Sequence, residues 1–146
     1  MKKKQTQQKQ RGFTLIEIII VVIIMSLLAA LIVPRLFKKV EKSKLQIAKT
    51  QILYLENAIK MFKLDTGRYP STEEGLGVLL ENTGSIHNWD GPYLEKGLPK
   101  DPWGRDYLYT CPGQNYVFDI TSLGADGKEG GEGENKDVNN WAPVGQ

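Results

Sequence analysis

Residues 11–34 read RGFTLIEIIIVVIIMSLLAALIVP. Phe13 to Val33 is a run of 21 residues with a single charge, and a helix of about 20 apolar residues is long enough to cross the hydrocarbon core of a bilayer. The preceding segment, residues 1–12, has five basic side chains and no acidic one, which predicts a cytoplasmic leader with the rest of the chain outside. A cleaved secretory signal fits less well, because a cut after Ala29 or Ala30 would place leucine where a small residue is needed.

Glu17 is the one charge inside this apolar run. A carboxylate at the centre of a spanning helix costs about 2.5–3.5 kcal/mol on insertion scales, and such residues usually mark function. The alternative is that Glu17 lies near the interface and reaches water, because only four residues separate it from Gly12. Physical arguments alone do not choose between these two interpretations.

Length, charge and cysteine content exclude several classes of protein. The 146 residues suit one small domain, and the net charge of +2 comes from the leader: five of 19 basic residues lie there, leaving 14 against 17 acidic residues. A basic surface for nucleic acid is therefore not expected. The single cysteine, Cys111, cannot form a disulfide within the chain, and we predict a small buried side chain there.

Beyond the apolar run the chain predicts an amphipathic continuation of the same helix as far as Leu64. Apolar residues recur at spacings of three and four, which makes one stripe on one helix face. We expect that stripe to pack on the protein's own domain. Its members are Leu45, Ala48, Ile52, Leu55, Ile59 and Phe62.

The remainder predicts a small domain built on that helix. Gly67 suits a C-terminal cap, and Ser71 with Glu74 is typical of a capping box that opens a second helix running to about Glu81. Residues 82–105 are rich in Gly, Pro and Trp and predict an ordered loop, with a turn at 101–104 anchored by Trp103. Strand-like runs at Leu108–Thr110 and Tyr116–Ser122 flank a turn and predict a hairpin. The expected fold class is α+β.

The sequence RGFTLIE at residues 11–17 resembles the processing site of type IV pilins and type II secretion pseudopilins. The resemblance implies that a prepilin peptidase cuts between Gly12 and Phe13 and that Phe13 is N-methylated. It also implies that Glu17 neutralises the new amine of a neighbouring subunit during assembly. Pro34 matches a family proline where the helix is expected to kink or locally melt.

Three further stretches narrow the resemblance to the major pseudopilin of type II secretion. They are GRYPSTEEGL (67–76), LPKDPWGRDYLY (98–109) and SLGADGKEGGEGENKDVNNW (122–141). Type IV pilins commonly end in a disulfide-bounded loop, which a single cysteine excludes. The resemblance implies a pilin-like fold in three parts: a cleaved leader (1–12), a membrane-spanning or filament-core half-helix (13–34) and a periplasmic domain (35–146).

The glycine-rich segment 122–141 raises the question of a metal site. Its acidic side chains and glycines could supply the oxygen ligands that Ca²⁺ takes, although composition alone favours a solvated flexible tail. The resemblance reverses that preference, because major pseudopilins bind one structural calcium in this loop. It implies side-chain ligands Asp126 and Asp137 and backbone carbonyls of Leu123 and Lys128. Where some relatives have two adjacent aspartates this chain has Lys136 before Asp137, so one ligand could instead come from Glu132, Glu134 or a carbonyl.

Enzyme motifs are missing from the sequence, and the only histidine, His87, is expected in a surface loop. We therefore expect a non-enzyme. The resemblance implies a single-pass protein of the bacterial inner membrane that polymerises into the type II secretion pseudopilus and drives export of folded proteins. The partners that it implies are other copies of the chain, the prepilin peptidase, an inner-membrane assembly platform with its ATPase, and minor pseudopilins. The alternatives are a type IV or competence pilus subunit, and a membrane-anchored calcium-dependent binding domain.

Overall fold

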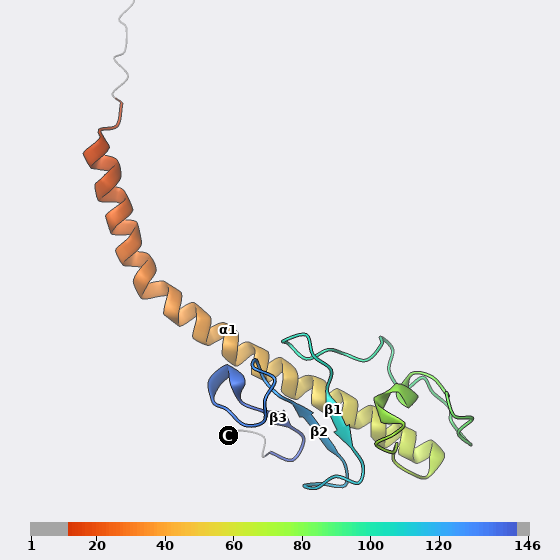
Figure 1. Cartoon of the computed structure of the whole chain (residues 1–146). Helices are drawn as coiled ribbons and strands as arrows, with labels where there is room; N and C mark the ends of the chain where they lie inside the picture. Colours follow the sequence, from red (N-terminus) through yellow and green to blue (C-terminus); the bar gives the residue numbers. More distant parts are fainter. Residues whose placement is uncertain (1–11, 143–146) are drawn as a thin grey trace, which may run out of the picture. The chain divides into compact units, whose positions relative to one another are not determined.

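The computed structural model describes residues 12–142, apart from the side chain of Lys38. Its long helix is followed by short elements only (Figure 1). The predicted leader lies outside the described residues, except for Gly12. The chain forms two compact units, one ending at Lys38 and the other beginning at Lys39. The elements are α1 (Leu15–Thr66), the 3₁₀ helix η1 (Gly75–Leu79), β1 (Leu108–Thr110), β2 (Asp119–Ser122), the 3₁₀ helix η2 (Gly133–Asn135) and β3 (Val138–Asn139).

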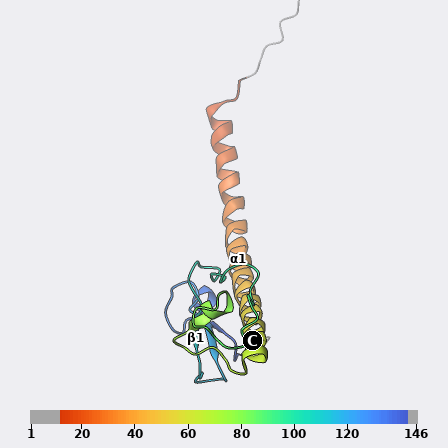
Figure 2. The same ribbon diagram turned by 90° about the vertical axis from the view of Figure 1, so that its right-hand side faces the viewer.

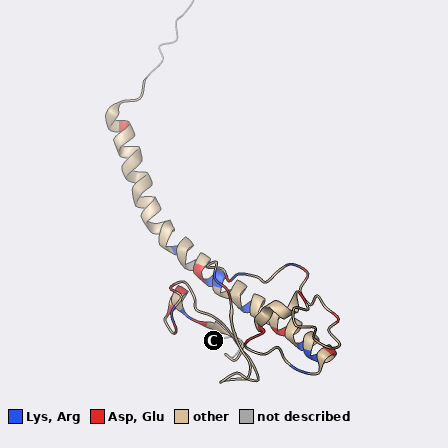
Figure 3. Ribbon diagram, turned by 45° about the vertical axis from the view of Figure 1, so that its right-hand side comes forward, with Lys and Arg blue, Asp and Glu red and all other residues tan. Residues whose placement is uncertain are grey.

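In the first unit, α1 is helical from Leu15 onward and continues through Pro34. The local melting expected at that proline is therefore not seen. Every residue from Leu15 to Val33 is exposed, and the helix is long and apolar enough to cross a membrane. Figure 3 shows one acidic residue near the start of α1, coloured red, and no other charged residue until well along the helix.

In the second unit, the predicted stripe of α1 forms the core, which confirms the expected packing. The last five members of the stripe, from Ala48 to Phe62, are at most 2% exposed, and Leu45 packs against them. Ala58 and Glu56 are also buried on this helix, although the spacing did not predict them. β1 and η1 lie on the same side of this half of α1 (Figure 2).

The end of α1 matches the sequence signals, whereas the second helix is shorter than predicted. Gly67 has φ +78° and donates its N–H to Lys63 O at 2.8 Å, as a left-handed cap does. Ser71 and Glu74 make both bonds of a capping box, each side chain accepting the other's backbone N–H, at 3.2 and 2.8 Å. The second helix predicted to run to about Glu81 is present but shorter: Gly75 has φ +62°, which interrupts a helical path, and a 3₁₀ helix from Gly75 to Leu79 follows.

The sheet is antiparallel with strand order β1-β2-β3, and Tyr109 of β1 pairs with Ile120 of β2. The predicted hairpin is confirmed, but β2 starts at Asp119 rather than Tyr116. The reason is that the carboxylate of Asp119 accepts the backbone N–H groups of Gln114, Asn115 and Tyr116, which holds those residues in the turn. The third strand, β3, was not predicted; two residues are too few to carry an alternation signal.

The stretch 82–105 has no helix or strand, as predicted, and is fixed by buried side chains. Trp89 donates its indole N–H to Val78 O at 2.7 Å, and Leu94 is 2% exposed. Trp103 packs against the core, as expected of an anchor. Cys111 is only partly buried, which differs from the prediction, because the turn that follows it is on the surface.

Candidate functional site

The junction between leader and apolar run is an exposed, non-helical segment. Gly12, Phe13 and Thr14 precede α1, and Phe13 is 79% exposed. Thr14 Oγ1 accepts the backbone N–H of Glu17 at 3.3 Å, the bond by which an N-cap threonine starts a helix. The peptide bond between Gly12 and Phe13 therefore lies just outside the helix, in an exposed segment without secondary structure.

Glu17 lies in the first turn of α1 and is exposed. A carboxylate there is favoured by the positive end of the helix dipole. Within residues 12–142 its side chain has no ion-pair partner. From Leu15 to Val33 the helix therefore presents one acidic group among otherwise uncharged, exposed residues.

The segment Leu123–Asp137 is a closed loop, in contrast to the flexible tail that composition favoured. Its two arms are joined by the bond from Ala125 N to Glu134 O at 2.8 Å. A Cβ at Gly124 would lie 2.8 Å from Glu134 O, so the two backbones approach closely there. Gly130 N donates to Asp137 Oδ2 at 2.8 Å and connects the far end of the loop to β3.

The predicted calcium ligands lie at both ends of this loop. Leu123 O accepts Gly127 N at 3.2 Å, and Asp126 Oδ1 accepts Lys128 N at 3.1 Å, so three of the four share one turn. Asp137 lies across the loop, and its Oδ1 is buried without a hydrogen-bond partner among the described residues. A buried carboxylate oxygen is costly to leave unpaired, so this atom fits a cation ligand.

The acidic side chains of the loop do not converge on one point. In the part of the chain that the structure describes, no three His, Cys, Asp or Glu side chains gather closely enough to hold a metal ion. Of the alternative ligands, Glu132 is exposed and Glu134 is half-buried at η2. An ion in this loop would therefore depend on backbone carbonyls, which Ca²⁺ accepts readily.

Arg105 contacts this loop and was not predicted from the sequence. Its guanidinium donates to the carbonyls of Gly124 and Ala125 at 2.6 and 2.8 Å. No local signal could reveal the contact, because some 20 residues separate donor and acceptors.

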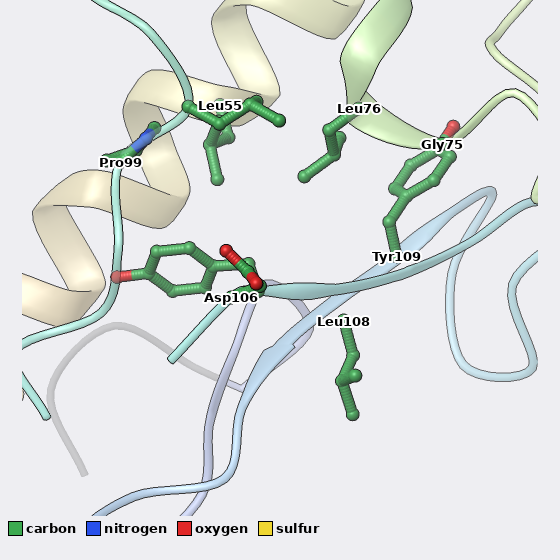
Figure 4. Close-up of a pocket in the computed structure, with 9 residues that line it drawn as sticks. Leu55, Gly75, Leu76, Pro99, Asp106, Leu108 and Tyr109 are labelled. Atoms are coloured by element: carbon green, nitrogen blue, oxygen red, sulfur yellow. The ribbon is translucent and has the colours of Figure 1, made fainter. Parts of the chain in front are cut away.

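A pocket of ≈ 240 Å³ lies between α1, η1 and β1 (Figure 4). Leu55, Leu76 and Tyr109 contribute to its lining, and its only carboxylate belongs to Asp106, which pairs with Lys100 at 2.8 Å. His87 is exposed, as predicted, and is not among the pocket residues. The pocket combines no nucleophile with a base.

Comparison with known proteins gives consistent matches over nearly the whole chain. A family model described as "Type II secretion system (T2SS), protein G" matches residues 35–141, and the "Prokaryotic N-terminal methylation motif" matches residues 7–33. The chain is 46% identical to the type II secretion system core protein G of Vibrio cholerae serotype O1 over 137 residues, covering 92% of this chain and 93% of that one. It is also 46% identical to the core protein G of Pseudomonas aeruginosa over 138 residues, covering 92% and 97%.

A solved structure supports the same assignment. The crystal structure of the major pseudopilin from the type 2 secretion system of enterohaemorrhagic Escherichia coli aligns with a TM-score of 0.61 and 37% identity. The alignment covers 74% of this chain and 95% of that one. The shared fold is therefore the long helix with a small antiparallel sheet.

Proposed function

The chain belongs to the type II secretion system protein G family, the major pseudopilins, and we propose that it is a precursor that is cut after Gly12, methylated at Phe13 and then polymerised into the pseudopilus. It is a structural subunit, and we infer no catalytic activity of its own. The filament extends from the inner membrane and drives export of folded proteins across the outer membrane. The family assignment favours this function over a type IV or competence pilus and over an anchored binding domain.

One observation carries the proposal: in the described part of the first unit, the apolar run buries no residue. From Leu15 to Val33 every residue is exposed, and the large side chains are at least 44% exposed. An apolar surface of this extent requires a covering partner. Lipid covers it while the subunit waits in the membrane, and helices of other copies cover it in the filament.

Glu17 makes this exchange of partners specific. Lipid tails are as apolar as the helix, so little hydrophobic energy distinguishes lipid from another helix. Cleavage creates an amine at Phe13, and a charge left alone in a filament core is much more costly than a paired one. The Glu17 carboxylate of one subunit neutralises the Phe13 amine of a neighbour and thereby sets the register of the helices.

The orientation follows from the same segment, and the partners are those that the family assignment implies. The basic leader holds the N-terminus in the cytoplasm, so the second unit lies in the periplasm. Processing requires a prepilin peptidase. Extraction of the apolar helix from the membrane requires an energy source, which we assign to an inner-membrane platform with its ATPase. Minor pseudopilins are the remaining partners that the family assignment implies.

We also propose that one Ca²⁺ binds in the loop Leu123–Asp137. Asp137 and Asp126 are the side-chain ligands, and the carbonyls of Leu123 and Lys128 contribute further oxygens. The support is the buried, unpartnered Oδ1 of Asp137 and the closed form of the loop. The ion supplies positive charge that neutralises the acidic loop, and by binding only the folded state it stabilises the domain.

The N-terminus of the protein purified from its native membrane tests the processing. Mass spectrometry is expected to show a chain that begins at Phe13 and is heavier by one methyl group. A chain that retains residues 1–12 in cells with an active prepilin peptidase would contradict the filament function and favour the anchored binding domain.

Glu17→Gln tests assembly independently of processing. We expect membrane insertion and cleavage to persist while filaments, counted after crosslinking in cells, are lost. The matched control is Ser26→Ala, because Ser26 Oγ only bonds Val22 O within its own helix. Normal filaments from Glu17→Gln would refute the pairing role.

Asp137→Asn tests the calcium site. With wild-type protein, millimolar Ca²⁺ is expected to raise the melting temperature of the second unit, and about a hundredfold excess over Kd stabilises by about 2.7 kcal/mol. Asp137→Asn should abolish that rise, whereas Glu129→Gln, an exposed change in the same loop, should keep it. An equal rise in both variants would exclude Asp137 as a ligand.

A further inference from the structure

Arg105 joins two segments that are remote in the sequence. One guanidinium nitrogen, Nη1, donates to Gly124 O at 2.6 Å, and the other, Nη2, donates to Ala125 O at 2.8 Å. Two consecutive carbonyls are thus held by one planar group. This fork geometry is available to arginine and not to lysine.

The backbone of Arg105 is itself fixed by a buried carboxylate. Asp101, 4% exposed, accepts the N–H of Arg105 on Oδ1 at 2.8 Å, and its Oδ2 accepts Ser122 Oγ at 2.6 Å. Asp101 N also donates to Arg105 O at 2.8 Å. Ser122 ends β2 immediately before the loop. The turn at 101–105 and the start of the loop therefore share one buried anchor.

The guanidinium also packs closely against the loop backbone. A Cβ placed on Gly127 would lie 2.8 Å from Arg105 Nε and 2.9 Å from its Cζ. Gly127 has φ +69°, so the turn needs glycine both for its backbone angle and for the space that Arg105 fills. The arginine thus contacts the turn at Gly124, Ala125 and Gly127.

We propose that Arg105 is a positioning residue that holds the turn Leu123–Lys128 in shape without a cation. By occupying the carbonyls of Gly124 and Ala125, it leaves the carbonyl of Lys128 and the second lone pair of Leu123 O, which already accepts Gly127 N, as acceptors for an ion. The turn Leu123–Lys128 is therefore preformed, and a cation has only to join it to Asp137 across the loop. The part of this inference that concerns calcium rests on the proposed function, whereas the cation-free part does not.

A purely electrostatic effect of Arg105 is the alternative explanation. The loop has several acidic side chains, and any cation nearby would reduce their mutual repulsion. Arg105→Lys separates the two roles, because lysine keeps the charge but cannot hold two carbonyls in a fixed fork. Arg105→Gln removes both the charge and the fork. Lys136→Gln, the control, removes one positive charge from an exposed position in the loop.

The test measures amide hydrogen exchange of the full processed chain in detergent micelles with a chelator present. The probe is the N–H of Gly127, which donates to Leu123 O within the turn. Arg105→Gln and Arg105→Lys should each lower its protection about tenfold, as expected when one or two ordinary hydrogen bonds are lost. Lys136→Gln should leave it unchanged. Full protection in Arg105→Lys would show a charge effect and overturn the proposal, as would full protection in Arg105→Gln.

Calcium titration of the same four proteins gives the second readout. Both arginine variants should bind Ca²⁺ about tenfold more weakly, the usual effect of losing a group that orients metal ligands. Unchanged affinity would overturn the role in ion binding. If the wild-type chain binds no Ca²⁺, the calcium site of the proposed function fails, but the exchange experiment still decides the cation-free role. Should Arg105→Gln fail to fold, Arg105→Lys alone decides it.

Discussion

The two halves of α1 have the same backbone conformation and opposite surroundings. From Leu15 to Val33 no residue is buried, whereas in the distal half Ala48, Ile52, Leu55, Ile59 and Phe62 are at most 2% exposed. The first half is apolar on all sides, and the second is apolar on one stripe. A helix that is apolar all round needs partners on every side, and a striped helix needs one partner on one side. The chain supplies that one partner itself, and the proposed function assigns the rest to the membrane or to other copies.

The largest expected effect on stability comes from truncating a core side chain in the striped half of α1. Phe62→Ala should lower the free energy of unfolding by about 3–5 kcal/mol, because Phe62 is fully buried and the surrounding residues can fill the space only in part. Ile23→Ala in the other half should leave that free energy unchanged. Urea unfolding in detergent, followed by fluorescence of Trp89 and Trp103, measures both. Equal losses would show that the two halves do not differ as described.

The second effect is expected in the uniformly apolar half. Ile24→Asp places a charge at the middle of the predicted span, which costs about 2.5–3.5 kcal/mol of insertion free energy. The variant should therefore be depleted from the membrane fraction. Tyr54→Asp, on the exposed face of the striped half, should insert normally. Normal insertion of Ile24→Asp would contradict a membrane-spanning role.

Asp119 shows that the second unit depends on a buried polar group, whereas residues 12–37 of the first unit include no buried residue. Burial alone would raise the pKa of the Asp119 carboxyl, but the bonds from Asn115, Gln114 and Tyr116 outweigh it and lower the pKa. Asp119→Asn should therefore reduce the free energy of unfolding by about 1.5–3 kcal/mol, the usual range for hydrogen bonds to a charged group. Thermal melting measures the loss. Asp106→Asn, an exposed carboxylate paired only with Lys100, serves as control and should change little.

The smallest expected effect is a loss of folding stability at low pH. Hydrogen bonding from Arg68, opposed by burial and assisted by Ser71, lowers the pKa of Glu74 to about 2. A lowered pKa stabilises the fold above the unfolded value of about 4.3, and this contribution is lost as the pH falls from there to about 2. Because the pair is partly exposed, the loss should stay under about 1 kcal/mol.

Glu74→Gln should remove this pH dependence, and Glu73→Gln, its exposed neighbour, should keep it. Unfolding by urea at a series of pH values between 5 and 2 compares the two variants with the wild type. If Glu74→Gln loses as much unfolding free energy between pH 5 and 2 as the wild type does, the loss comes from other carboxylates.

Patterns within one turn or one helix were predicted well. The apolar stripe, the glycine cap at Gly67 and the two bonds between Ser71 and Glu74 are confirmed, because spacing and capping chemistry determine them locally. The pilin-like α+β fold and the family are also confirmed. The roles of Gly12, Phe13 and Glu17 and the four calcium ligands stay predictions.

The differences from prediction occurred where one backbone angle or one side chain overrides the pattern of its neighbours. A capping box predicted a helix from Ser71 to about Glu81, but the left-handed backbone at Gly75 limits it to a 3₁₀ helix that ends at Leu79. Strand propensity predicted β2 from Tyr116, but the Asp119 carboxylate draws Tyr116 and its preceding neighbours into a turn. In both cases one strong local group decides between two conformations that the pattern does not distinguish.

The sequence by itself determined the helix, its uncovered apolar half, the single carboxylate in that half and the one-sided stripe. Each of these follows from the order of side chains along one helix. Only the tertiary structure decided that Arg105 holds Gly124 and Ala125, that Asp101 anchors both segments and that Asp137 keeps a buried, unpartnered oxygen. The physical reason is that helical periodicity acts within a few residues, whereas hydrogen bonds across some 20 residues exist only after the chain has folded.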